Sequence, residues 1–227
     1  MAQNCSPTTK CIAAAIVAVV IISTLTTFAY YKSDETLRNT ARWGLESTAG
    51  VMATQINASE IQNLKPGDEN TPQYQAVAAK LRNMRSMDDR LLNAYIIRVN
   101  TTDMSTSFLV DDLYPLDPSG SAKIGEIYNP PDKREILEAL SGPTASPAPY
   151  TDQWGSFVSA YAPIDDSAIN SNGNTYAVLG LDVSADEYTS VTDQDNWIIV
   201  SGVISIIVVL GILFILGRKA VTEKTQT

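Results

Sequence analysis

Residues 156–163 read SFVSAYAP and residues 175–183 read TYAVLGLDV, and these two stretches decide the fold. Each is a run of strand-forming residues with the two-residue alternation of a β-strand. The polar loop 165–174 separates them, and Asn172-Gly173 within it is a turn signal. Together they predict two strands of one antiparallel sheet.

Alternation sorts the side chains of the second stretch onto two faces of the sheet. One face is purely apolar and is expected to pack on the long first helix; it holds Ala177, Leu179, Leu181 and Val183. On the other face Gly180 leaves space, and Asp182 places a carboxylate near the strand end. Asp182 could therefore bind a ligand ammonium group or a backbone N–H, cap the helix that follows, or do both.

The rest of the sheet is expected upstream. Residues 93–99 and 107–111 are strand-like and flank the turn 100–103, which predicts a hairpin. Tyr150 is expected on a further short strand. With the helices described next, the order of elements predicts an α+β fold with one antiparallel sheet.

Three helices are expected in the same region. Residues 33–58 carry an apolar stripe at helical spacing, and either start at Ser33 or continue a helix from the preceding apolar run. Thr71-Pro72 predicts the start of a second helix that ends near Asp88. Asp132 is expected to cap a short helix through Leu140.

Two uncharged apolar runs bracket the chain, Cys11–Tyr30 and Trp197–Leu216. Each has about 20 residues, enough to cross roughly 30 Å of hydrocarbon. Arg218 and Lys219 follow the second run, so the positive-inside rule puts both termini in the cytoplasm. The alternative for the first run is a cleaved signal peptide.

This layout predicts a two-pass protein of the plasma or inner membrane. The expected organisation is a cytoplasmic tail (1–10), a transmembrane helix (11–31), an extracytoplasmic domain (32–196), a second transmembrane helix (197–217) and a short cytoplasmic tail (218–227).

Composition narrows the function. Residues 31–196 hold 12 of the 16 basic and 24 of the 25 acidic side chains, which disfavours binding to nucleic acid or anionic lipid. The chain has no histidine, so His-based catalysis and His metal ligands are excluded, and we expect no enzyme, no cofactor and no metal. The two cysteines, Cys5 and Cys11, precede the domain, which must be held by its core.

Residues 150–165 (YTDQWGSFVSAYAPID) and 177–184 (AVLGLDVS) are distinctive. They resemble the extracytoplasmic Cache sensor domains, the PAS-like modules of prokaryotic membrane receptors. The resemblance covers most of residues 31–196 and includes the hairpin. It implies a long helix leaving the membrane, a five-stranded antiparallel sheet, a small-molecule pocket on the outer face of the sheet, and a final helix returning to the membrane.

Receptors of this kind usually carry a signalling module after the second membrane helix. Only about ten residues follow Leu216 here. We therefore expect either a receptor fragment or a sensor that acts through a separate cytoplasmic signalling protein. A homodimer is a further expectation, because small residues could allow close approach of two first helices: Ala41, Gly44 and Thr48.

The expected ligand-binding residues are aromatic or polar side chains on the strands and the turn: Tyr95, Trp154, Ser159, Tyr161 and Asp182. Aromatic bodies with hydroxyl tips suit a mostly apolar pocket with few polar groups. The alternatives are that Tyr161 is a core residue with a satisfied hydroxyl and that Trp154 plugs the core.

Other polar residues are expected to be solvated. Arg98 lies on the strand face opposite Tyr95 and is expected at the surface; the alternative is that its face is the pocket face, where it would pair with a ligand carboxylate. The neighbours Asp111-Asp112 and Asp165-Asp166 are expected to be exposed pairs. Asn57 and Asn100 each begin an N-glycosylation pattern.

Three functions remain in view: a ligand-sensing ectodomain, a structural or adhesive surface protein with the same fold, and an ectoenzyme using Asp pairs. A cavity on the sheet face lined by the candidate residues would favour sensing, whereas a face filled by its own side chains would favour a structural role.

Overall fold

The computed structural model describes residues 7–165, 169, 173–192 and 196–224. It divides into two compact units, which are described separately: Met1–Arg38 with Thr192–Thr227, and Asn39–Val191. Cys5, Asp166 and Asn172, on which some expectations rested, lie outside the described residues.

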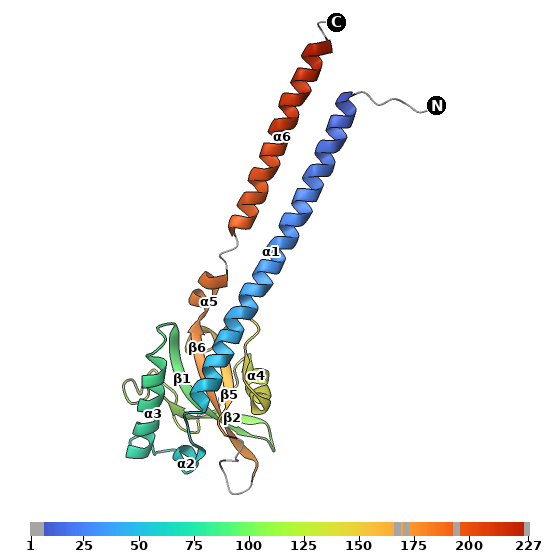
Figure 1. Ribbon diagram of the computed structural model, residues 1–227. Coiled ribbons are helices and arrows are strands. Elements are labelled where there is room, and N and C mark those ends of the chain that lie inside the picture. The colour runs from blue at the N-terminus through green and yellow to red at the C-terminus, as the bar shows by residue number, and fades with distance from the viewer. Residues whose placement is uncertain (1–6, 166–168, 170–172, 193–195, 225–227) are drawn as a thin grey trace. The chain divides into compact units, whose positions relative to one another are not determined.

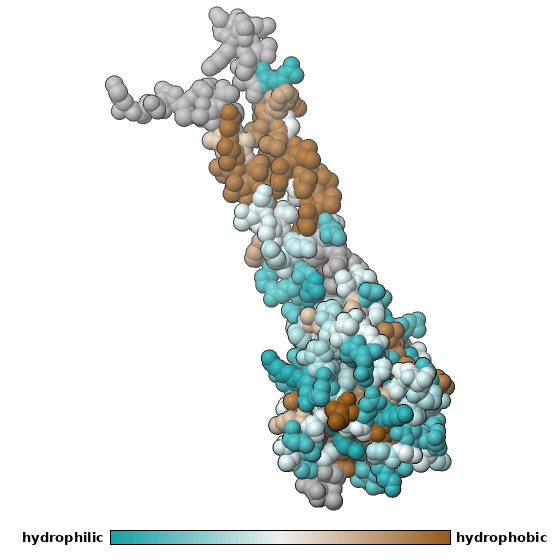
Figure 2. Space-filling view, turned by 180° about the vertical axis from the view of Figure 1, so that it is seen from behind, coloured by the Kyte–Doolittle hydropathy of each residue, from teal (hydrophilic) through white to brown (hydrophobic). Residues whose placement is uncertain are grey.

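The first unit contains two long apolar helices. Helix α1 spans Pro7–Ala53 and continues into the second unit, and α6 spans Asn196–Lys224. Both are long and apolar enough to cross a membrane, which is consistent with a two-pass membrane protein. The space-filling view shows apolar residues gathered on these helices (Figure 2). Because α1 is continuous through Ser33, no helix starts there, and the alternative of one long helix is correct.

The second unit is built on one antiparallel sheet (Figure 1). Its strands are β1 (Leu91–Asn100), β2 (Ser105–Asp111), β3 (Thr144–Ala145), β4 (Tyr150–Thr151), β5 (Ser156–Pro163) and β6 (Thr175–Ser184). They pair in the order β2-β1-β6-β5-β3, and β4 also pairs with β5. The hairpin β1–β2 and the short strand at Tyr150 are as expected.

The sheet has six strands in the described residues, not five. The missed strand, β3, has only two residues and lies in the Pro-rich segment 143–149. Thr144 and Ala145 pair with Tyr161 and Ala160 of β5. Two residues cannot show a periodicity, so no sequence pattern marks this strand.

Three helices cover one face of the sheet: the end of α1, α2 (Ala58–Ile61) and α3 (Pro72–Arg85). The strand residues packed in this core include those assigned by alternation: Ala177, Leu179, Leu181 and Val183. The Thr71 side chain caps α3 with Pro72 at its first position, as expected, but α3 ends at Arg85 rather than near Asp88.

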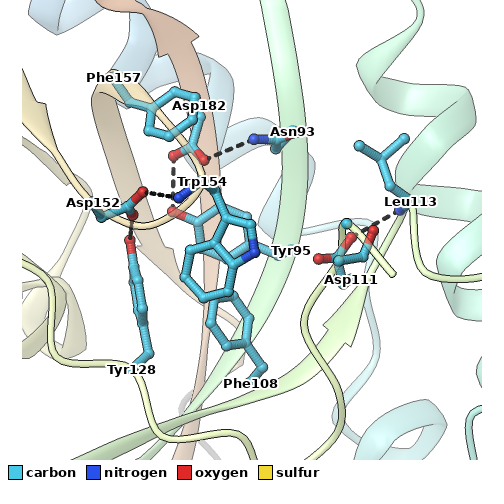
Figure 3. Close-up of a pocket in the computed structure, with 12 residues that line it drawn as sticks. Asn93, Tyr95, Phe108, Asp111, Leu113, Tyr128, Asp152, Trp154, Phe157 and Asp182 are labelled. Carbon is cyan, nitrogen blue, oxygen red and sulfur yellow. Dashed lines mark hydrogen bonds between the residues drawn. The ribbon is translucent and has the colours of Figure 1, made fainter. Parts of the chain in front are cut away.

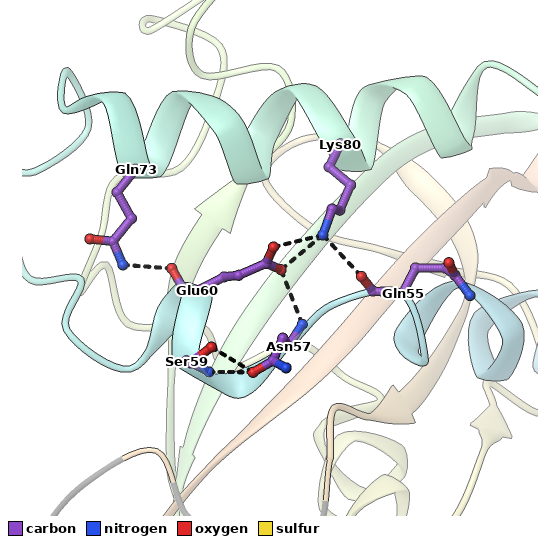
Figure 4. A network of polar contacts seen from close by, with 6 residues as sticks. All are labelled: Gln55, Asn57, Ser59, Glu60, Gln73 and Lys80. Carbon is purple, nitrogen blue, oxygen red and sulfur yellow. Dashed lines mark hydrogen bonds and ion pairs between the residues drawn. The ribbon is translucent and has the colours of Figure 1, made fainter.

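A capping box separates α2 from α1, and this explains why the predicted helix 33–58 ends early. The Asn57 side chain accepts from the Ser59 N–H, and the Glu60 carboxylate accepts from the Asn57 N–H (Figure 4). The Lys80 ammonium of α3 then bonds Glu60 and the Gln55 carbonyl. These contacts fasten the turn after α1 to α3.

The opposite face of the sheet is covered by the loop 112–131, by α4 (Lys133–Glu138) and by the 3-10 turn η1 (Ala139–Ser141). Asp132 precedes α4 but its side chain does not cap it, because the carboxylate instead accepts from Ser146 and Tyr161. The expectation that Asp132 caps this helix was therefore wrong, because residues distant in the sequence donate hydrogen bonds to its carboxylate.

Strand β6 leads directly into α5 (Ala185–Thr192). The Ser184 hydroxyl accepts from the Glu187 N–H at 3.0 Å and so caps α5. Asp182 has other partners, so its interpretation as the helix cap was wrong.

Candidate functional site

The register of three central strands brings the predicted polar residues to one face of the sheet, opposite α1. Gly180 of β6 lies between Tyr95 of β1 and Tyr161 of β5, and Asp182 lies beside Ser159. Cross-strand partners share a face, so these side chains point to the same side.

Gly180 allows the ring of Tyr95 to lie flat across the sheet. A Cβ added at Gly180 would be 2.2 Å from Cε2 of Tyr95, closer than two carbon atoms can approach. The ring therefore occupies the space that any other residue would fill. Its hydroxyl reaches Asp182 and donates to Oδ1 at 2.8 Å.

Asp182 accepts hydrogen bonds from side chains of two neighbouring strands, β1 and β5 (Figure 3). Its Oδ1 accepts from Tyr95 and also from the Ser159 hydroxyl at 2.5 Å, and its Oδ2 accepts from the Asn93 amide at 3.2 Å. The side chain is almost fully buried. Burial raises the pKa of Asp182 to about 7, against the lowering effect of these hydrogen bonds.

A chain of hydroxyl groups runs from Asp182 to a second buried carboxyl group. Tyr150 contacts the Ser159 hydroxyl at 2.7 Å and the Tyr161 hydroxyl at 3.4 Å, and Tyr161 donates to Asp132 at 2.9 Å. Burial also raises the pKa of Asp132, whose Oδ1 has no hydrogen-bond partner among the described residues. The β5 side of the face is thus filled by a polar network.

Aromatic rings form the other side of the site. Trp154 packs edge-on against Phe108, with ring centroids 5.3 Å apart, and contacts Tyr128 at 5.8 Å. Tyr128 in turn donates to Asp152 at 3.1 Å. Asp152 holds the turn that carries Trp154, because its other oxygen accepts the backbone N–H of Trp154 at 2.8 Å.

A cavity of about 120 Å³ remains between these rings and Asp182 (Figure 3). Its lining comes from β1, β2, β5, β6, the loop 112–131 and the turn before β5: Asn93, Tyr95, Phe108, Asp111, Leu113, Gly120, Ser121, Tyr128, Asp152, Trp154, Phe157 and Asp182. Of the five candidate residues, Tyr95, Trp154 and Asp182 line it.

Ser159 and Tyr161 are not among the residues that line the cavity. Both are fully buried and act through hydrogen bonds to Asp182 and Asp132. Tyr161 is therefore a core tyrosine with a satisfied hydroxyl, the alternative considered from the sequence. A supporting role for both remains a prediction.

Asp111 and Asp112 are not an exposed pair, because Asp112 is fully buried and Asp111 is partly buried. Asp112 is fully buried on the helix side, where it pairs with Arg85 at 2.7 Å and accepts the Ala94 N–H. Asp111 points the other way into the cavity wall, where it accepts two backbone N–H groups, and burial raises its pKa to about 6. The opposite directions were expected, but the exposure was wrong because α3 and the loop 112–131 cover the hairpin end.

Arg98 also differs from the surface position expected. It lies half-buried on the helix side and donates to the Leu64 carbonyl at 2.8 Å, and burial lowers its pKa. It does not line the cavity.

Sequence patterns missed the contributions of the loops. Tyr128 lies in a loop without periodicity, so no pattern predicts that it lines the cavity. Asn93 was predicted to lie on a strand but not to line the cavity. Asp152 had one usable signal, since an Asp two residues before Trp154-Gly155 suits a side chain that turns back onto its own backbone.

No family model and no curated protein sequence matches this chain. A similar solved structure is the sensor domain of DcuS from E. coli, with 17% sequence identity and a TM-score of 0.43, over 70% of this chain and 99% of that chain. A likeness this weak supports no argument about function, which has to rest on the geometry of the sheet face.

Proposed function

We propose that residues 39–191 form an extracytoplasmic sensor that binds a small molecule on the sheet face and passes a conformational signal to the two apolar helices. The observation that carries the proposal is the cavity between Asp182 and the aromatic rings of Tyr95 and Trp154. A concave site with apolar walls and a few convergent polar groups is the usual form of a small-molecule site.

Strand β6 offers a route for the signal. On one face Asp182 reaches the cavity, and on the other Leu179 and Leu181 pack in the core that contains the end of α1. The strand also leads without a break into α5. A ligand that moves Asp182 would therefore act on both helical connections, and shifts of about 1–2 Å are enough for such switches.

The output would pass either to a separate cytoplasmic protein or to a signalling module of a longer chain. Pairing of two copies through α1 is part of this proposal. Gly44 is exposed, and a Cβ there would meet no atom of the described residues within 4 Å apart from its own stretch of helix, so another helix could approach closely.

One observation favours the structural or adhesive alternative. The β5 part of the sheet face is filled by its own side chains, with Ser159 and Tyr161 fully buried. Of the β5 residues only Phe157 lines the cavity, and Ser159 and Tyr161 do not. The two functions therefore make different predictions about this cavity.

A thermal-shift screen separates them. The full chain, purified in detergent, would be heated with amino acids, carboxylates and amines. A ligand that binds only the native state, at 100 times its Kd, stabilises it by about 2.7 kcal/mol. The matched variants are Ser121→Phe, which fills the cavity from its rim, and Ser121→Ala, which leaves it open. A shift present in Ser121→Ala and absent in Ser121→Phe supports sensing; no shift with any class contradicts it.

A further inference from the structure

We infer that the cavity on the sheet face selects a small organic cation, such as a primary or quaternary ammonium ion. This rests on the proposed sensing function and adds the chemical class of the ligand. The basis is the combination of three carboxylates and a set of aromatic walls around one small space.

The charges that line the cavity all have one sign. Asp111, Asp152 and Asp182 each contribute a carboxyl group, and no lysine or arginine is among the lining residues. Arg85, which approaches the end of the hairpin, is engaged by Asp112 on the opposite side of the sheet. A carboxylate or phosphate ligand would meet like charge here, whereas a cation would find its counter-ion.

Asp182 has room to accept a further donor. Its Oδ1 already takes two hydrogen bonds, but among the described residues Oδ2 takes only the long one from Asn93. A carboxylate oxygen can accept two. An N–H group of a primary ammonium ligand would supply the missing donor together with a positive charge, whereas a quaternary ammonium ion would supply the charge alone.

The aromatic lining suits the rest of such a ligand. Tyr95, Phe108, Tyr128 and Trp154 all line the cavity, and their rings pack against one another edge-on or tilted, with centroids 4.7 to 6.3 Å apart. Aromatic faces attract cations within about 6 Å of the ring centroid. Methyl groups of a quaternary ammonium would also gain from apolar contact there.

Size and coordination restrict the cation further. The cavity measures about 120 Å³, close to the roughly 150 Å³ of a protein cavity that holds benzene. This favours a ligand with few non-hydrogen atoms. A metal ion is a weaker candidate, because the described residues contain no group of three or more acidic, Cys or His side chains placed to hold one.

The test is binding by the full chain in detergent, measured by thermal shift and by calorimetric titration. Tetramethylammonium and ethylammonium are the cationic probes, tert-butanol is the uncharged counterpart of the first, and acetate and Mg²⁺ are the competing classes. We expect saturable binding of a cation with little or no binding of tert-butanol. Asp182→Asn should weaken cation binding at least about 10-fold, whereas Asp89→Asn, which removes an exposed carboxylate, should not change it.

Trp154→Leu provides a second variant if Asp182→Asn does not fold, and this variant should also bind the cation more weakly. Binding of acetate but of neither cation would overturn the ligand class and leave the sensing proposal standing. Binding of Mg²⁺ alone, or equal binding of tetramethylammonium and tert-butanol, would also overturn the ligand class and leave the sensing proposal standing. No binding of any probe, including the wider screen, would overturn both.

Discussion

The chain should lose stability as the pH rises from about 5 to about 8. Replacing Asp182 with asparagine should make this loss much smaller. Asparagine keeps the shape of the side chain, and its carbonyl can still accept from Tyr95 and Ser159 at the position of Oδ1. The Asn93 amide can turn so that its own oxygen faces the new amide nitrogen. The substitution therefore removes the titration while leaving the hydrogen bonds nearly intact.

The magnitude follows from the pKa of Asp182, which burial raises from an ordinary value of 3.8 to about 7. The folded chain holds a proton that the unfolded chain has released. The contribution of Asp182 to stability is thus complete below about pH 4 and is lost as the pH rises through about 7. Linkage gives a loss of about 2.5 kcal/mol between pH 5 and pH 8, or about 5–10 °C in Tm for a domain of this size.

Thermal unfolding of the full chain in detergent, followed by near-UV circular dichroism, measures this directly. Burial also raises the pKa values of Asp111 and Asp132, so these groups add a slope of the same sign in both proteins. The difference between the chain and Asp182→Asn isolates Asp182, and Asp89→Asn is the surface control. Equal pH slopes in the chain and in Asp182→Asn would refute the conclusion that burial raises the pKa of Asp182.

Three further outcomes are expected. Gly180→Ala should cost about 1–3 kcal/mol, because the new methyl group displaces the Tyr95 ring; denaturant unfolding checks this, and an unchanged stability would show that the ring does not lie over Gly180. Asn57→Ala should cost about 1 kcal/mol through loss of the α2 cap, with Asn57→Ser largely retaining it; equal losses in both would argue against capping. The affinity for an ammonium ion should rise from pH 5 to pH 8, because Asp111 and then Asp182 lose their protons over this range; calorimetry that finds tighter binding at pH 5 would contradict this.

Much of the fold could be predicted because its long elements carry periodic patterns. Alternation along β6 placed Leu179 and Leu181 on the helix side and Asp182 on the other side, as found. Thr71-Pro72 located the start of α3. The two-residue strand β3 could not be predicted, since hydrogen bonds to β5 define it rather than any local pattern.

The candidate site was predictable only where strands supply it. Tyr95 and Asp182 follow from alternation, whereas Tyr128 reaches the cavity from a loop whose path depends on long-range packing. Asp132 illustrates the same limit. Its position before a helix favoured a cap, but Tyr161 and Ser146, which are distant in the sequence, donate hydrogen bonds to its carboxylate. Burial of Asp112 likewise depends on α3, which no local pattern around it reveals.

The central claim, that the cavity beside Asp182 is a ligand site, is tested most directly by titrating Ser121→Ala and Ser121→Phe with the same ligand in a calorimeter. Both variants alter one residue that lines the cavity, and only the second introduces a side chain large enough to compete with a ligand for its space. We expect saturable one-to-one binding to Ser121→Ala and none to Ser121→Phe, with both variants folded. Equal affinity in the two variants would place the ligand elsewhere and contradict the account.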